Sequence, residues 1–195
     1  MLNFSCQRCG ECCRRYYIIS LPREVRAQAK ALGKNEADFI EEHMQLFLQF
    51  FPTGHREDKI VVSSSLIPKK FAVQIEGNLG HLPEFLICLP MLAFRRREGG
   101  ECTFYDSQNS ACTIYDTRPV ECRLFPFISD KKVEGYSKLY PFCHGLNAKD
   151  DKKSYVDLSF IHFKEVSDYF SEVKSKGFTG MWKTWPKDGV CLFTD

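Results

Sequence analysis

The chain has 195 residues, of which 44% are hydrophobic and 14% aromatic, so it can bury a sizeable core and disorder is not expected. Its 27 lysines and arginines nearly balance its 25 acidic residues, and the net charge of +2 indicates neither a nucleic-acid partner nor a membrane surface. The sequence contains no long apolar stretch that could span a membrane, and its N-terminus lacks the apolar segment of a signal peptide. We therefore expect a cytoplasmic protein with a single domain over residues 1–195.

The first third of the chain predicts two helices after a cysteine-rich head at residues 3–17. Pro22 suits the first turn of a helix, and Gly33 is a typical stop for the same helix. A second helix is predicted over residues 35–50, because apolar side chains repeat at helical spacing after the capping residue Asn35.

The middle of the chain has strand-like patterns. The runs KIVVSSS at 59–65 and KFAVQIE at 70–76 favour β-strands, and the apolar run at 85–94 is expected to be buried. The sequence CTFYD at 102–106 returns as CTIYD at 112–116 with a turn-like linker between the two copies, which predicts a β-hairpin or two equivalent loops.

Helical signals follow the repeat. Asp116 or Thr117 is expected to cap a short helix with Pro119 in its first turn. A long amphipathic helix is predicted over residues 155–176. The fold class expected from these patterns is α+β: a mostly helical domain with a small β-hairpin or sheet, organised around a cysteine-ligated metal site.

The cysteines carry the strongest chemical signal, since there are ten of them. Clustered cysteines in a reducing compartment bind metals or carry out redox chemistry more often than they form disulfides. A disulfide between the neighbours Cys12 and Cys13 would also be strained, because the bridge needs a wider separation of Cα atoms.

The head, CQRCGECC, places Cys6, Cys9 and Cys12 at the CxxCxxC spacing with which a loop holds three corners of an iron–sulfur cubane. Gly10 would let the backbone turn sharply and approach a metal closely. Zinc sites usually present two separate CxxC pairs, and the second half of the chain has none. It offers instead four widely spaced cysteines, namely Cys102, Cys112, Cys122 and Cys143.

The doubled cysteine needs its own explanation. One metal ion can hardly bind both Cys12 and Cys13, because adjacent side chains diverge. Cys13 is therefore expected to serve a second nearby metal or to remain a free thiol. Cys88 lies in an apolar run and is expected to be a buried hydrophobic residue, with extra ligation as the alternative, and Cys191 has no assigned role.

Two arginines flank Cys122. Arg118 and Arg123 could neutralise the charge of a thiolate centre, lower thiol pKa values and donate hydrogen bonds to sulfur. The alternative for both is an ion pair with Asp116 or Glu121.

The cysteine pattern resembles the YkgJ-type cysteine-cluster family, the CxxCxxCC domain described as zinc- or iron-chelating. The matching parts are CQRCGECC, GGEC, CTIYDTRPVECRLFP and CHG, which cover residues 3–146 and leave 147–195 as a C-terminal helix and tail. The resemblance implies metal binding through eight cysteines: Cys6, Cys9, Cys12, Cys13, Cys102, Cys112, Cys122 and Cys143. It implies no single metal or reaction, and some members are similar to flagellin lysine N-methylases.

Three functions follow as hypotheses. The first is an iron–sulfur protein, with a [4Fe–4S] cluster and a redox, sensing or maturation role, favoured by the CxxCxxC spacing. The second is a structural or interaction domain that binds Zn²⁺. The third is a protein lysine N-methylase, although the sequence has neither a G-x-G-x-x-G loop nor CxxxCxxC. The expected partners are a metal or cluster and a protein redox partner or substrate, with no nucleic acid and no membrane.

Overall fold

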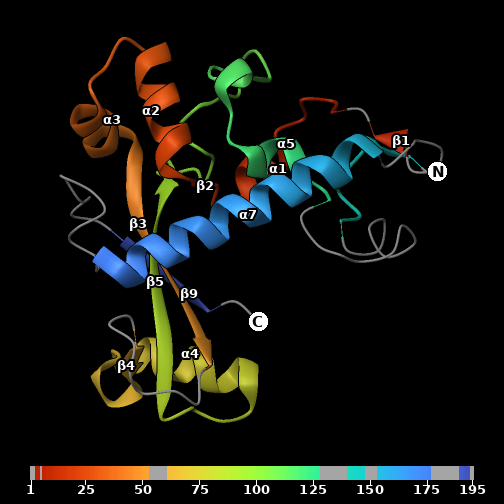
Figure 1. The fold of residues 1–195 in the computed structure, drawn as a ribbon. Helices are drawn as coiled ribbons and strands as arrows, with labels where there is room; N and C mark the ends of the chain where they lie inside the picture. Colours follow the sequence, from red (N-terminus) through yellow and green to blue (C-terminus); the bar gives the residue numbers. More distant parts are fainter. Residues whose placement is uncertain are drawn as a thin grey trace. The chain divides into compact units, whose positions relative to one another are not determined.

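The computed structural model describes residues 3–4, 6–52, 61–127, 140–147, 153–176 and 189–193. The chain divides into two compact units, each built from two segments (Figure 1). Unit 1 comprises Met1–Glu36 and Phe94–Val166, and unit 2 comprises Ala37–Ala93 and Ser167–Asp195. The single domain over residues 1–195 stays a prediction. None of the helices in the described ranges is long and apolar enough to cross a membrane.

Helices and strands occur together, so the α+β class is confirmed, while its organisation around a metal site stays a prediction. The elements of unit 1 are β1 (Asn3–Phe4), α1 (Glu11–Arg15), β2 (Ile19–Ser20), α2 (Pro22–Ala31), β6 (Tyr105–Asp106), β7 (Ala111–Cys112), the 3-10 turn η2 (Tyr115–Thr117), α5 (Val120–Leu124) and β8 (Leu146–Asn147). Strand β1 pairs antiparallel with β8, and β6 with β7. The long helix α7 (Lys153–Lys176), predicted from its amphipathic pattern, has residues in both units.

Helix α2 begins at Pro22 as predicted, and its end at Ala31 is followed by Gly33 with a positive φ of 66°. A buried carboxylate on this helix holds two neighbouring segments. Glu24 accepts hydrogen bonds from the backbone N–H of Leu21 at 2.9 Å and from that of Val120, the first residue of α5, at 2.6 Å. The expected cap of α5 by Asp116 or Thr117 is therefore wrong, because Pro119 occupies the capping position and Glu24 accepts from the N–H of the first helical residue, Val120.

The repeat forms the predicted hairpin. Tyr105 lies opposite Cys112 across β6 and β7, and the N–H of Thr113 donates to the carbonyl of Phe104 at 2.9 Å. The hairpin thus carries one motif cysteine, Cys112, on its second strand.

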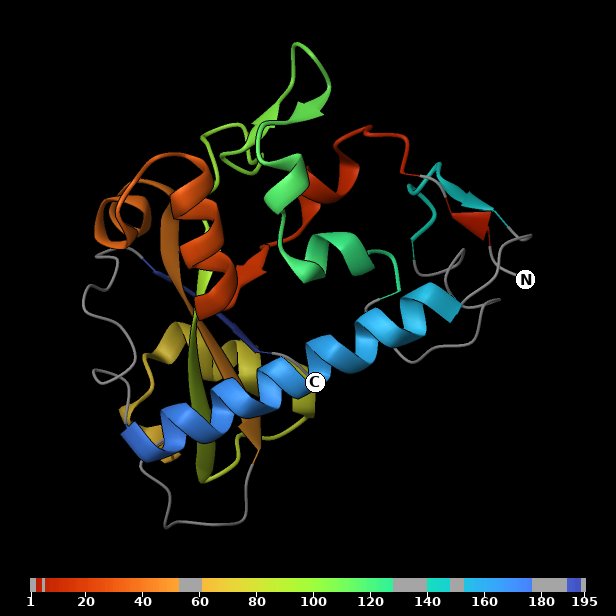
Figure 2. The same ribbon diagram turned by 45° about the horizontal axis from the view of Figure 1, so that its top comes forward.

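Unit 2 contains α3 (Glu36–His43), β3 (Met44–Pro52), β4 (Val61–Ser63), the 3-10 turn η1 (Ser64–Leu66), α4 (Lys69–Leu79), β5 (Phe85–Phe94) and β9 (Gly189–Phe193). Its sheet has the order β5-β3-β9, with β3 parallel to β9 and β4 antiparallel to β5. Figure 2 shows β3 and β5 side by side along this sheet.

Two predictions in unit 2 are wrong. The helix expected over 35–50 ends at His43, and the chain continues as β3, because Met44–Pro52 hydrogen bonds between two other strands of the sheet. The strand expected at 70–76 is part of α4 instead. Phe71, Ile75 and Leu79 recur every four residues and pack on one cluster, and this helical spacing prevails over the local alternation.

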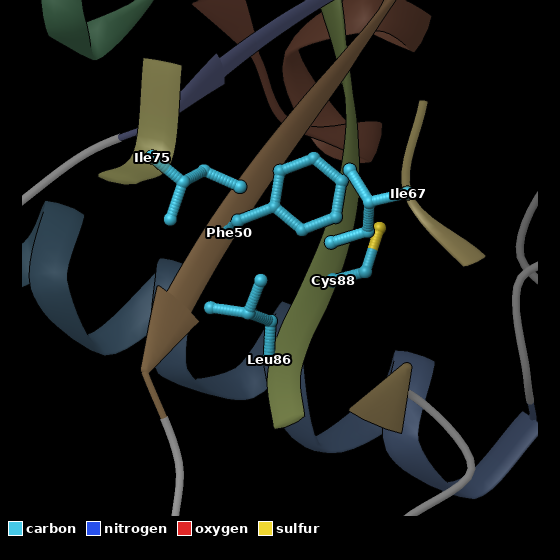
Figure 3. Packing of buried hydrophobic residues seen from close by; sticks show 5 residues of the cluster. All are labelled: Phe50, Ile67, Ile75, Leu86 and Cys88. Atoms are coloured by element: carbon cyan, nitrogen blue, oxygen red, sulfur yellow. The ribbon is translucent and has the colours of Figure 1, made fainter. Parts of the chain in front are cut away.

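The core of unit 2 includes a cluster formed by Phe50, Ile67, Ile75, Leu86 and Cys88 (Figure 3). Cys88 has only 5% of its surface exposed, which confirms the prediction that it is a buried hydrophobic residue. The apolar run at 85–94 is β5, and it is buried as predicted.

Candidate metal centre

The head folds back on the hairpin through Gly10. This residue has a positive φ of 75° and immediately precedes α1. A Cβ atom at this position would overlap the ring of Tyr105, so only glycine allows the two segments to approach this closely.

Tyr105 contacts the head and is buried, with only 2% of its surface exposed. Its hydroxyl donates to the carbonyl of Cys9 at 3.3 Å. Arg14 on α1 lies over the Tyr105 ring, 5.1 Å from the centroid, and donates from Nη2 to the tyrosine Oη at 3.4 Å. The first CxxC is thereby fixed to the hairpin that carries Cys112.

A second link joins the doubled cysteine to the later half of the chain. The N–H of Cys102 donates to the carbonyl of Cys13 at 2.8 Å. Arg96, which pairs with Cys102 across an isolated bridge, donates to the carbonyls of Arg14 and Arg15. The cysteines of the two halves are therefore neighbours through backbone hydrogen bonds.

A cavity of about 80 Å³ lies beside these links in unit 1. Cysteines predominate in its lining, and seven of the eight predicted ligands contribute to it: Cys6, Cys9, Cys12, Cys13, Cys112, Cys122 and Cys143. All eight motif cysteines carry free thiols. The structure thus places cysteines of the head and of the later segment around one cavity, and their role as ligands stays a prediction.

Cys102 is the motif cysteine that does not line the cavity. It is buried, with 7% of its surface exposed, and burial raises the pKa of its thiol to about 11. The charges of Cys112 and Cys12 raise that pKa further. Cys102 therefore interacts electrostatically with the other thiols although it is not part of the cavity lining.

The thiols favour their protonated form. The pKa of Cys12 is strongly raised, first by a hydrogen bond with the Cys13 side chain and then by burial. Burial is also the largest cause of the raised pKa values of Cys112, Cys122 and Cys143, and the charge of Cys12 adds to all three. A bound metal would have to displace these protons.

The two predicted arginines are placed differently. Arg118 lines the cavity, and its charge lowers the pKa of Cys112. Arg123 is exposed and is not among the lining residues, and its charge instead lowers the pKa of Glu24. The ion pair with Asp116 or Glu121, the alternative left open by the sequence, is not formed by Arg118 among the described residues.

Arg118 is positioned by Tyr115, with its guanidinium 3.9 Å from the ring centroid. Arg8 stacks on the same ring at 4.5 Å, and it also lines the cavity. Sequence reasoning missed Arg8, although its position inside the first CxxC could have drawn attention to it. Two cations held by one tyrosine therefore stand beside the thiols.

Thiols are the most frequent donors in the lining, which also includes the carboxylate of Glu11, and they fit thiophilic metals such as zinc or iron in iron–sulfur clusters. His144 is exposed and is not a lining residue, so the histidine nearest the motif does not join the thiols. Among the described residues, no three cysteine, histidine or acidic side chains stand in an arrangement that could hold a metal ion. Metal binding would therefore draw the thiols closer together.

Comparison with known proteins supports the same chemistry. Residues 5–144 match the family model named CxxCxxCC, described as "Putative zinc- or iron-chelating domain". No curated protein and no solved structure matches the chain.

Proposed function

The chain belongs to the CxxCxxCC family of zinc- or iron-chelating domains, and from this premise we propose that its metal centre is an iron–sulfur cluster, of the [4Fe–4S] type. The candidates for its four ligands are the eight motif cysteines: Cys6, Cys9, Cys12, Cys13, Cys102, Cys112, Cys122 and Cys143. A second centre or free thiols would account for the others. The proposed role is redox chemistry, sensing or cluster maturation, and a redox role would require a protein partner that exchanges electrons.

One observation carries this proposal: seven thiols from both halves of unit 1 line a single cavity. A closed zinc site and a [4Fe–4S] cubane each use four ligands, so these seven thiols can supply either centre and leave three over. The CxxCxxC spacing of Cys6, Cys9 and Cys12 also suits three corners of one cubane.

The roles within the site follow from this arrangement. Cys6, Cys9 and Cys12 would bind one centre together with a cysteine of the second half. Cys13 would serve a second centre or stay a free thiol. Arg118 and Arg8 would offset the negative charge that a thiolate-bound cluster carries.

Zinc is the second candidate, and the small volume of the cavity, about 80 Å³, favours it. A single ion needs less room than a cubane and no inorganic sulfide. The lysine N-methylase alternative rests on the family resemblance alone.

Metal analysis of the protein purified without oxygen tests the proposal. We expect iron and acid-labile sulfide in equal amounts, with the visible absorption of an iron–sulfur cluster. Zinc without sulfide would refute the iron–sulfur centre and support the second candidate.

Two serine substitutions then separate the adjacent cysteines. Cys12→Ser should abolish the chromophore, whereas Cys13→Ser should retain it. The matched comparison is informative because both side chains line the cavity. Equal loss in the two variants would contradict the assignment of Cys13 to a role outside the first centre.

A further inference from the structure

Two arginines in the lining of the thiol cavity have hydrogen-bond donors that the described protein does not use. Arg8 lies in the head shortly before α1, and Arg118 lies shortly before α5. These two helices lie side by side in Figures 1 and 2. Among the residues that the structure describes, neither guanidinium has an ion-pair or hydrogen-bond partner.

The ring of Tyr115 holds both side chains near one point. The Cζ atom of Arg118 lies 3.9 Å from the ring centroid, and that of Arg8 lies 4.5 Å from it. A cation–π contact engages the charge of a guanidinium and leaves its five N–H groups without an ordinary hydrogen-bond acceptor. Two sets of donors are thus fixed close together at the cavity, where an anion could meet both.

The backbone of Arg8 supports a role in binding. Its φ is 54°, a left-handed conformation that a residue with a side chain rarely adopts. Such conformations persist where the surrounding structure imposes them, and they are frequent in segments that clamp a ligand. In this protein the conformation accompanies the contact of Arg8 with Tyr115 at the cavity.

The described lining of the cavity also has an excess of positive charge. Its one acidic residue is Glu11, which forms ion pairs with Arg14 at 3.5 Å and with Arg15 at 3.0 Å. The charge of Glu11 is therefore offset by arginines outside the lining, and it does not neutralise Arg8 or Arg118. The cavity, of about 80 Å³, has several times the space that one water molecule requires, so a small anion can enter it.

We propose that Arg8 and Arg118 bind a phosphate-type dianion at the thiol cavity of the metal-free protein, either free phosphate or the terminal phosphate group of an organic molecule. A carboxylate has two oxygens, which one guanidinium can satisfy. A phosphate group has more oxygens and about twice the charge, so it can pair with both guanidiniums. The inference goes beyond the proposed function and holds for either metal. A thiolate-bound metal would use the same positive charges, so the anion site belongs to the metal-free state.

NMR titration of the metal-free full chain tests the proposal, with inorganic phosphate, glycerol 3-phosphate and acetate as probes. Ionic strength is kept constant, because added salt by itself screens the arginines. We expect phosphate to bind about tenfold more tightly than acetate. Tighter binding of glycerol 3-phosphate than of phosphate would identify an organic phosphate as the ligand, and the reverse order a free anion. Phosphate that binds no more tightly than acetate would overturn the proposal.

Substitutions locate the site. Arg8→Gln and Arg118→Gln each remove one charged group and should weaken phosphate about tenfold. Arg123→Gln is the matched control, since it removes the same charge from an exposed residue outside the lining, and it should bind phosphate like the native protein. Equal phosphate affinity in all three variants would refute the site, because net charge rather than position would then govern binding.

A measurement on the native protein decides the matter if a variant fails to fold. Bound phosphate should shift the backbone amide resonances of Arg8, Tyr115 and Arg118, which line the cavity. Phosphate shifts that occur only outside the cavity lining would contradict the proposed site.

Discussion

At the scale of single residues, Gly10 has the most constrained position in the site. Its backbone is left-handed, and the ring of Tyr105 fills the space that any side chain would need. The hydroxyl of Tyr105 also donates to the carbonyl of Cys9. Tyr105 therefore fixes both the backbone turn at Gly10 and the distance between the head and the hairpin.

Gly10→Ala should lower the free energy of unfolding of the metal-free protein by about 2 kcal/mol or more, from the left-handed backbone and the overlap with Tyr105. Urea denaturation measures this loss. The control is Gly77→Ala in α4, where nothing lies within 4 Å of an added Cβ and the backbone is helical. That substitution should be neutral or stabilise by about 0.5–1 kcal/mol. Equal effects at the two positions would contradict the close approach at Gly10.

Arg118 is a second single residue with a defined effect, because its charge changes the pKa of the Cys112 thiol. Its cation lowers the pKa of Cys112, so Arg118→Ala should raise that pKa and decrease the thiolate fraction at a given pH. Alkylation of Cys112 in the metal-free protein, followed by mass spectrometry at about pH 8, should then slow by about two- to tenfold. Arg123→Ala is the matched control and should leave the rate unchanged, because Arg123 does not line the cavity. The same slowing in both variants would show that net charge alone matters.

At the scale of elements, α2 and α5 are joined by buried polar side chains rather than by apolar packing alone. Glu24 accepts from Leu21 and Val120, and Gln28 donates to the carbonyl of Thr117 at 3.2 Å. The start of α5, and with it Cys122, is therefore positioned by a helix far away in the sequence.

Glu24→Ala should destabilise the metal-free protein by about 1–3 kcal/mol, because two backbone N–H groups lose their acceptor in a buried setting. Thermal or urea unfolding measures the change. Glu76→Ala, an exposed carboxylate on α4, is the comparison and should stay within about 0.5 kcal/mol of the native protein. A loss no larger at Glu24 than at Glu76 would show that its two hydrogen bonds contribute no net stability.

At the scale of the whole molecule, the eight motif cysteines all belong to unit 1, although residues 37–93 of unit 2 separate the first four from the last four. The proposed metal centre would therefore be assembled from two distant segments of sequence within one compact unit. The same enclosure that gathers the thiols raises their pKa values, as at Cys102, Cys122 and Cys143.

Metal binding should consequently release protons. A thiol whose pKa is raised is protonated at neutral pH, and a metal binds the thiolate, so each cysteine that becomes a ligand should give up about one proton. Titration of the metal-free protein with Zn²⁺ in weakly buffered solution and a pH indicator measures the release. The apparent affinity should rise between about pH 6 and pH 8, since fewer protons compete. Binding without proton release would contradict protonated thiols in the metal-free state.

Sequence reasoning predicted the local elements well and the non-local ones poorly. Helix α2 and the hairpin of Tyr105 and Cys112 depend on nearby residues, through Pro22 and through the repeat. Residues 44–52 form a strand because they pair with other strands of the sheet, and those strands are distant in the sequence. Residues 70–76 form a helix because the side chains of Phe71, Ile75 and Leu79, four residues apart, pack on one cluster. Arg8 was missed because its partner Tyr115 is more than a hundred residues away.

The sequence by itself determined the donor chemistry: eight cysteines in a fixed order and the membership of a zinc- or iron-chelating family over residues 5–144. Only the tertiary structure decided that seven of those thiols line one cavity, that Cys102 is not in the lining, and that Arg118 lines it whereas Arg123 does not. It alone also placed the rings of Tyr16, Phe125 and Tyr140 around a second space that Cys12 and Cys122 line. The physical reason is that residue types and spacing are properties of the chain, whereas enclosure, and the pKa values it sets, arise from contacts between distant segments.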